Sequence, residues 1–340
     1  MLEAWRDAST IEEDGQNETE TLTGKVLGKV YLMIKQAFAI ASMLLLCSGI
    51  AYADSDSCKT VRFADVGWTD IQVTTSSATI VLEALGYNTE VTTISVPVAL
   101  ASMKNNDIDV FLGNWMPSMT LEMAPYNAEK SIDTVGLNLD GAGYGLVVPQ
   151  YVADAGVKGL ADLGAHKEKF KGKIYGIDPG DEGNRIISEM IAEPKNNLAG
   201  FELIESSEAG MLTEAEKAMA KNEWIIFLAW TPHPIMAGMK IHYLDGMGES
   251  GFGSAKVYTL SRAGYAKDCP NAGRLLSNLK FDLAMESAMM EPVLKDGVDP
   301  KASALAWLKA NQNAIKPWLQ DVTTIDGGDA VAAVSAALAK

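Results

Sequence analysis

The sequence predicts an α/β fold of two lobes with a ligand cleft between them. From Asp54 onward, strand-like segments alternate with amphipathic helical segments, a pattern typical of a mostly parallel sheet with helices on its faces. The alternation occurs twice, and the C-terminal third has too few strand-like segments for a third sheet. The 340 residues also leave room for two domains.

The first α/β unit contains three β-branched, strand-like segments and two helical ones. Ser76 or Ser77 is a candidate cap for the first helix, Gly86 is its stop signal, and Pro97 suits a first helical turn. The expected strands cover residues 60–66, 89–96 and 109–115, and the expected helices cover 76–86 and 97–107.

The second unit repeats this alternation, and three amphipathic helices follow it. Its expected strands cover residues 143–149, 172–178, 201–205 and 223–230, and its expected helices cover 181–193 and 207–222. Further strands are expected over 241–245 and 256–260, and further helices over 272–281, 282–294 and 302–319.

We therefore expect a discontinuous first lobe, residues 54–145 and 235–326, and a continuous second lobe, residues 146–234, that lies between its two parts in the sequence. Residues 327–340 form an Ala-rich C-terminal tail. Ligands of such sheets lie outside the C-terminal ends of the strands, which for two facing lobes is the cleft between them.

Residues 1–53 are expected to be an N-terminal extension plus a signal peptide. Residues 33–53 carry a lysine, an apolar run and a closing Ala-Tyr-Ala, which is typical of a cleaved secretory signal. The apolar run is too short for a transmembrane helix. We therefore expect export from the cytoplasm, with cleavage near Ala53.

The first 32 residues are polar and acidic, unlike a targeting segment, so Met33 is a candidate for the true start. Lipidation at Cys47 is the alternative to simple cleavage. It is disfavoured because Leu46 precedes the cysteine, where a lipoprotein signal has a small residue.

Cleavage would leave Cys58 and Cys269, and two cysteines in an exported chain predict one disulfide. A zinc site needs more ligands than two cysteines and three scattered histidines comfortably provide, so we expect no metal. The formal net charge of −16 argues against a nucleic-acid partner and agrees with a cationic or neutral one.

Four aromatic residues share a local pattern that indicates display from a turn. Each follows or ends a strand-like segment and has a glycine or proline within two residues; they are Trp68, Trp115, Tyr144 and Trp230. Core rings usually lie inside an element, as Trp224, Trp307 and Trp318 are expected to do. One such ring could be a half-buried core residue, but four at matching positions favour a shared aromatic site.

Converging aromatic faces suit a quaternary ammonium ion. This cation donates no hydrogen bond, so ring quadrupoles and methyl contacts are the main interactions available to it, at about 2 kcal/mol for each desolvated contact. Flat sugars also stack on tryptophan, but sugar sites need many polar side chains beside the rings. Few such side chains occur near these four residues.

Five segments, "DVGWTD", "GNWMPSM", "GAGYGLVVP", "IDPGDEGNR" and "FLAWTPHP", resemble the periplasmic choline-binding proteins of ABC transporters, within the wider glycine betaine, proline betaine and choline group. The resemblance covers about residues 58–322. It implies the periplasmic substrate-binding protein fold, of a type II-like kind. It also implies an aromatic box around a trimethylammonium group, formed here by Trp68, Trp115, Tyr144 and Trp230.

The resemblance further implies polar anchors for the choline hydroxyl, namely Asp70 and the 178–184 loop. Relatives resembling this chain have Asn where it has Asp181, so either Asp181 or Asn184 could make the contact. Asp181 also suits a helix N-cap. Asp70 can pair with the cation and would repel a betaine carboxylate, whereas His233 could favour betaine or be a satisfied turn residue.

The sequence does not favour an enzyme, and we expect no cofactor. "GMGESG" (246–251) matches G-x-G-x-x-G but precedes a strand-like segment rather than a helix. The expected function is capture of choline and its delivery to the membrane permease of an ABC transporter. The alternatives are glycine betaine, proline betaine or acetylcholine as ligand, or a quaternary-ammonium sensor or chaperone-like module.

Overall fold

The structure is a computed structural model that describes residues 54–248 and 250–340, all within one compact unit. The predicted extension and signal peptide, with the candidate start at Met33 and the cleavage near Ala53, lie outside the described residues. Within the described ranges, no helix combines the length and hydropathy that crossing a membrane requires.

The described strands form one sheet with the order β2-β1-β3-β9-β4-β7-β5-β6, and β8 pairs with β4. The strands are β1 (Thr60–Asp65), β2 (Asn88–Thr93), β3 (Val110–Met116), β4 (Ile132–Pro149), β5 (Lys173–Tyr175), β6 (Glu202–Ile204), β7 (Phe227–Thr231), β8 (Ile241–Tyr243) and β9 (Gly253–Arg262). The pairing is parallel from β1 to β2 and β3, and from β5 to β6 and β7.

The middle of the sheet is antiparallel, so the expectation of a mostly parallel sheet holds only for its two ends. Strand β4 pairs antiparallel with β7, β8 and β9, and β9 also pairs antiparallel with β3. The 18-residue β4 is long enough to belong to both α/β units. Because the expected boundary between residues 145 and 146 falls inside β4, the division into lobes stays a prediction.

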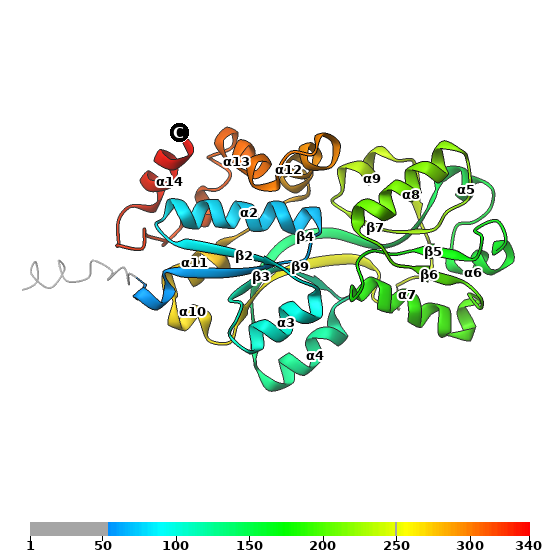
Figure 1. The fold of residues 1–340 in the computed structure, drawn as a ribbon, viewed down its shortest axis with the longest axis horizontal. Coiled ribbons are helices and arrows are strands. Elements are labelled where there is room, and N and C mark those ends of the chain that lie inside the picture. Colours follow the sequence, from blue (N-terminus) through cyan, green and yellow to red (C-terminus); the bar gives the residue numbers. More distant parts are fainter. Residues whose placement is uncertain (1–53, 249) are drawn as a thin grey trace, which may run out of the picture. The chain divides into compact units, whose positions relative to one another are not determined.

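Helices α12 and α13 pack against α2, so the C-terminal helices lie on the first unit. Figure 1 shows these three helices on one side of the sheet and α3 and α4 on the other. The helices are α2 (Thr69–Ala84), α3 (Val96–Lys104), α4 (Thr120–Glu129), α5 (Gln150–Asp154), α6 (Leu160–Leu163), α7 (Glu182–Ala192), α8 (Glu208–Ala220), α9 (Pro234–Gly238), α10 (Tyr265–Asp268), α11 (Pro270–Asn278), α12 (Leu283–Asp296), α13 (Pro300–Ala310) and α14 (Ala330–Leu338). Short 3-10 helices cover Asp56–Cys58, Gly164–His166, Pro194–Asn196 and Lys316–Leu319.

Helix α2 begins at Thr69, seven residues before the expected start at Ser76. Gly67 adopts a left-handed backbone, φ +87°, and donates its N–H to the Asp65 carboxylate, which turns the chain directly into the helix. The first two turns are rich in β-branched residues, which have low helix propensity. Most of these residues are buried, and their packing outweighs that preference.

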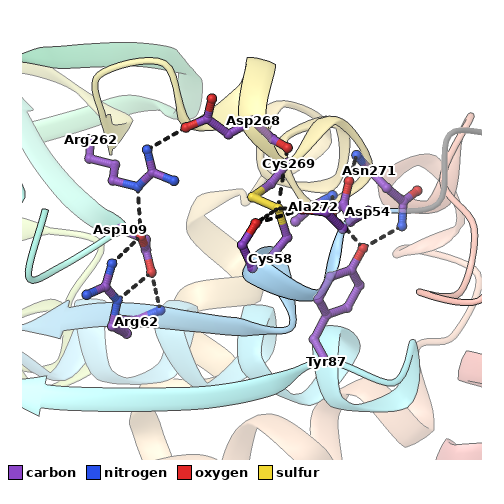
Figure 2. Close-up of a disulfide and its surroundings, with 12 residues drawn as sticks. Asp54, Cys58, Arg62, Tyr87, Asp109, Arg262, Asp268, Cys269, Asn271 and Ala272 are labelled. Carbon is purple, nitrogen blue, oxygen red and sulfur yellow. Dashed lines mark hydrogen bonds and ion pairs between the residues drawn. A yellow bond between two sulfur atoms is a disulfide. The ribbon is translucent and has the colours of Figure 1, made fainter.

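Cys58 and Cys269 form the predicted disulfide, with their Cα atoms 5.6 Å apart. Figure 2 shows a second link beside it, in which the Asp54 carboxylate accepts hydrogen bonds from the backbone N–H groups of Asn271 and Ala272. The described N-terminal segment is therefore fastened to α11, on the side of the first unit.

Candidate functional site

One small cavity brings together all six residues predicted to bind a ligand. Its lining consists of Trp68, Asp70, Trp115, Tyr144, Ile177, Asp181, Glu182 and Trp230. Four of these residues lie in segment 54–145 and four in segment 146–234. Both expected lobes therefore contribute to the cavity wall.

Trp68 and Trp115 reach the cavity from the ends of two neighbouring parallel strands. Trp68 is the residue before α2, and its extended backbone directs the chain from the Gly67 turn into the helix. Trp115 is the last residue but one of β3, where it pairs with Val257 of β9. Both agree with the expected position at a strand end.

Tyr144 lies inside β4 and not in a turn, so the expected local pattern is wrong for this residue. It pairs directly with Trp230 of β7, which places the two side chains on the same face of the sheet. The ring centroids of Tyr144 and Trp115 are 5.7 Å apart, and Phe252 packs edge-on against Tyr144 at 5.2 Å. The sheet pairing therefore helps bring the four rings of the predicted aromatic box to the wall of one cavity, and their contact with a ligand stays a prediction.

Asp70 lies in the first turn of α2 with only 2% of its surface exposed, and its Oδ1 atom makes no hydrogen bond within the described structure. Burial, and then the nearby Glu208 carboxyl group, raise the pKa of Asp70 to about 8. The backbone N–H groups of Asp70 and Ile71, and then the indole N–H of Trp115, favour the ionised form and partly offset this rise in the pKa. A cation that binds beside Asp70 would supply the positive charge that stabilises its ionised carboxylate.

Asp181 caps α7, as expected, and it also lines the cavity, so its contact with a ligand stays a prediction. Its Oδ1 atom accepts hydrogen bonds from the N–H groups of Gly183 and Asn184, at 2.7 and 3.2 Å, and from the Tyr144 hydroxyl at 3.0 Å. Its Oδ2 atom makes no hydrogen bond among the described residues. Burial raises the pKa of Asp181 to about 7.

Asn184 and His233 do not belong to the cavity lining. The Asn184 amide hydrogen-bonds the backbone N–H and C=O of Ile177 and supports the 178–184 loop. His233 caps α9 by accepting the N–H of Met236. The structure therefore agrees with the interpretation of His233 as a satisfied turn histidine.

Ile177 and Glu182 also line the cavity. Neither was singled out from the sequence as a ligand-binding residue. Glu182 accepts a hydrogen bond from the Ser118 hydroxyl at 3.0 Å through Oε1, whereas Oε2 has no partner in the described structure. Burial, and then Asp181, raise the pKa of Glu182 well above its ordinary value. A glutamate in a first helical turn is common near the helix dipole, so its position alone gave no signal.

The cavity thus combines four aromatic rings with three buried carboxyl groups. Two indole N–H groups, of Trp115 and Trp230, also make no hydrogen bond among the described residues. Rings attract a cation through their quadrupoles, and carboxyl oxygens accept hydrogen bonds or pair with positive charge. This arrangement suits a small organic cation that carries a hydrogen-bond donor.

Residues 59–310 match the family model described as the substrate binding domain of ABC-type glycine betaine transport systems. A solved ABC-transporter choline-binding protein in complex with choline is 52% identical, with a TM-score of 0.82 over 84% of this chain and 100% of that one. Its unliganded semi-closed form gives a TM-score of 0.77 at the same identity and coverage.

A curated relative from Listeria monocytogenes, a glycine betaine/carnitine transport binding protein, is 30% identical over 170 residues, which is 49% of this chain and 55% of the relative. The family model and the two solved structures each match most of the described residues. The chain therefore belongs to the family of substrate-binding domains of ABC-type glycine betaine transport systems.

Proposed function

We propose that this protein captures choline and delivers it to the membrane permease of an ABC transporter. The observation that carries the proposal is that the aromatic box and Asp70 line the same cavity. The structural similarity to a choline-binding protein in complex with choline supports the same ligand.

The aromatic box provides the affinity for the trimethylammonium group. Each desolvated cation–π contact contributes about 2 kcal/mol, so four rings would contribute roughly 8 kcal/mol before the costs of binding. That is the scale of a micromolar dissociation constant. Trp68, Trp115, Tyr144 and Trp230 are the residues assigned to this role.

The carboxyl groups provide the preference for choline over its relatives. The choline hydroxyl can donate to Asp70 or to Asp181, which both lie in the wall of the cavity. A betaine carboxylate would be repelled by these acidic groups in their ionised form, which a bound trimethylammonium group favours. The ester of acetylcholine has no hydroxyl group to donate, so it would leave the buried carboxyl oxygens without a partner.

We further propose that the protein is exported to the periplasm after cleavage near Ala53, and that it is a transport receptor rather than an enzyme. Binding would close the lobes formed by residues 54–145 with 235–326 and by residues 146–234. The cavity wall contains residues from both, which supports closure around the ligand.

Calorimetric titration of the mature chain with choline, acetylcholine and glycine betaine tests the proposal. We expect choline to bind most tightly, with a dissociation constant near or below the micromolar range. The family description includes glycine betaine, and a preference for it would overturn the choline assignment. Absence of binding to all three ligands would overturn the quaternary-ammonium site itself.

A further inference from the structure

Glu208 is a buried carboxyl residue that stands behind the cavity wall. It is the first residue of α8 and is 5% exposed, but it is not part of the cavity lining. Its hydrogen-bond partners come from two other segments, and each partner lies within three residues of one tryptophan of the predicted aromatic box.

The first partner is Thr69, the residue that follows Trp68. The Thr69 backbone N–H donates to Glu208 Oε2 at 2.8 Å, and the Thr69 hydroxyl lies 3.0 Å from both carboxyl oxygens. These bonds hold the start of α2. Because Trp68 immediately precedes that start, its ring position depends on the same backbone.

The second partner is His233, which packs against Trp230. The N–H of Met236 donates to His233 Nδ1 at 3.3 Å, so Nδ1 carries no proton and Nε2 does. Nε2 therefore donates to Glu208 Oε1 at 3.0 Å. The same imidazole meets the Trp230 ring edge-on, with the centroids 4.8 Å apart.

The position of Glu208 in a helix does not explain this arrangement. An acidic residue in a first turn normally interacts with the free N–H groups of its own helix. In α8, the cap is the Ser207 hydroxyl, which accepts the N–H of Gly210 at 3.2 Å. Both Glu208 oxygens are instead directed to Thr69 and His233.

We propose that Glu208 is a positioning residue that holds the Trp68 and Trp230 sides of the cavity together and so slows ligand release. The clasp is the set of hydrogen bonds from Thr69 and His233 to the Glu208 carboxyl group. The inference rests on the proposed function. In the predicted division, Thr69 belongs to the first lobe, and Glu208 and His233 belong to the second. Opening of the lobes would therefore break the bonds to Thr69 and leave the Glu208 carboxyl group with only its hydrogen bond to His233.

Stopped-flow binding of choline, followed by tryptophan fluorescence, tests the clasp. At pH 9, where Asp70 is mostly ionised even with Glu208 nearby, Glu208→Ala should weaken choline binding at least about tenfold, as expected for loss of hydrogen bonds to a carboxyl group. The loss should appear in the dissociation rate, with the association rate changed less than about threefold. Thr69→Val, which keeps the backbone N–H and loses the hydroxyl, should give a smaller increase in the dissociation rate.

Ser207→Ala is the matched control, because it removes the cap of the same helix and leaves the clasp intact. An equal rise in dissociation rate for Ser207→Ala and Glu208→Ala would overturn the proposal, since both would then act through the stability of α8. An unchanged dissociation rate in Glu208→Ala would overturn it as well.

Small-angle scattering of the unliganded proteins separates the clasp from the choline assignment. Glu208→Ala should increase the radius of gyration relative to the wild type, and Ser207→Ala should not. If the wild type does not bind choline, the proposed function fails, and the scattering comparison still decides the clasp. Equal radii of gyration for the wild type and Glu208→Ala would refute the clasp.

Discussion

The raised pKa of Asp70 predicts that choline binds more tightly as the pH rises from 7 to 9. In the unliganded protein this pKa is about 8, because the carboxyl group is buried and lies near Glu208. The group is therefore about one tenth ionised at pH 7 and about nine tenths ionised at pH 9. A bound cation stabilises the ionised form, so it lowers the pKa and releases a proton.

The expected size of the effect follows from the ionised fraction. If the ionised form binds choline and the neutral form does not, the apparent dissociation constant is the intrinsic one divided by that fraction. Choline should then bind about tenfold more tightly at pH 9 than at pH 7, a difference of about 1.4 kcal/mol. Glycine betaine should respond in the opposite direction, because its carboxylate is repelled by the ionised Asp70.

Calorimetric titrations at pH 6, 7, 8 and 9, each in two buffers of different ionisation enthalpy, measure affinity and proton release together. At pH 7 the wild type should release about nine tenths of a proton on binding choline. Asp70→Asn is the control: at pH 9 it should bind choline at least about tenfold more weakly than the wild type. It should also lose the pH dependence between 7 and 9. A wild-type affinity that is constant over this range, or highest at pH 6, would refute the reasoning.

Three further predictions concern the box, the cap and the disulfide. Trp230→Ala should weaken choline binding by about 2 kcal/mol, roughly thirtyfold by calorimetry, whereas Trp224→Ala, outside the cavity lining, should not. Asp181→Asn should keep the melting temperature, because Asn caps a helix as well as Asp does, and should flatten the pH dependence of choline affinity below pH 7, where the pKa of about 7 contributes. Replacing Cys58 and Cys269 by serine should lower the free energy of unfolding in urea by about 2–5 kcal/mol and leave choline affinity unchanged.

Each of these predictions has an outcome that contradicts it. Equal losses of affinity in the two tryptophan variants would show that Trp230 acts through general stability. A large fall in melting temperature for Asp181→Asn would mean that the charge, and not the cap, stabilises α7. A serine variant as stable as the oxidised wild type would show that the disulfide constrains the unfolded chain very little.

Residue types and the order of neighbouring residues in the sequence were enough to predict much of the candidate site. Glycines and prolines next to Trp68, Trp115 and Trp230 indicated rings at the ends of strands, and all three line the cavity. Two cysteines in a chain expected to be exported predicted the disulfide that the structure contains. Such inferences succeed because backbone conformation near a glycine or proline, and the pairing of two cysteines, depend little on distant packing.

Tertiary structure alone decided the remainder. Tyr144 lies opposite Trp230 because β4 pairs with β7, and no local pattern encodes this pairing of two residues more than 80 positions apart in the chain. The burial of Glu182, the raised pKa of Asp70 and the bonds of Glu208 to Thr69 and His233 likewise arise where distant segments meet and exclude water. Hydrophobic periodicity indicates which face of an element is buried, but the partner of that face, and therefore the charge and the hydrogen bonds of a buried carboxyl group, depend on how the whole chain packs.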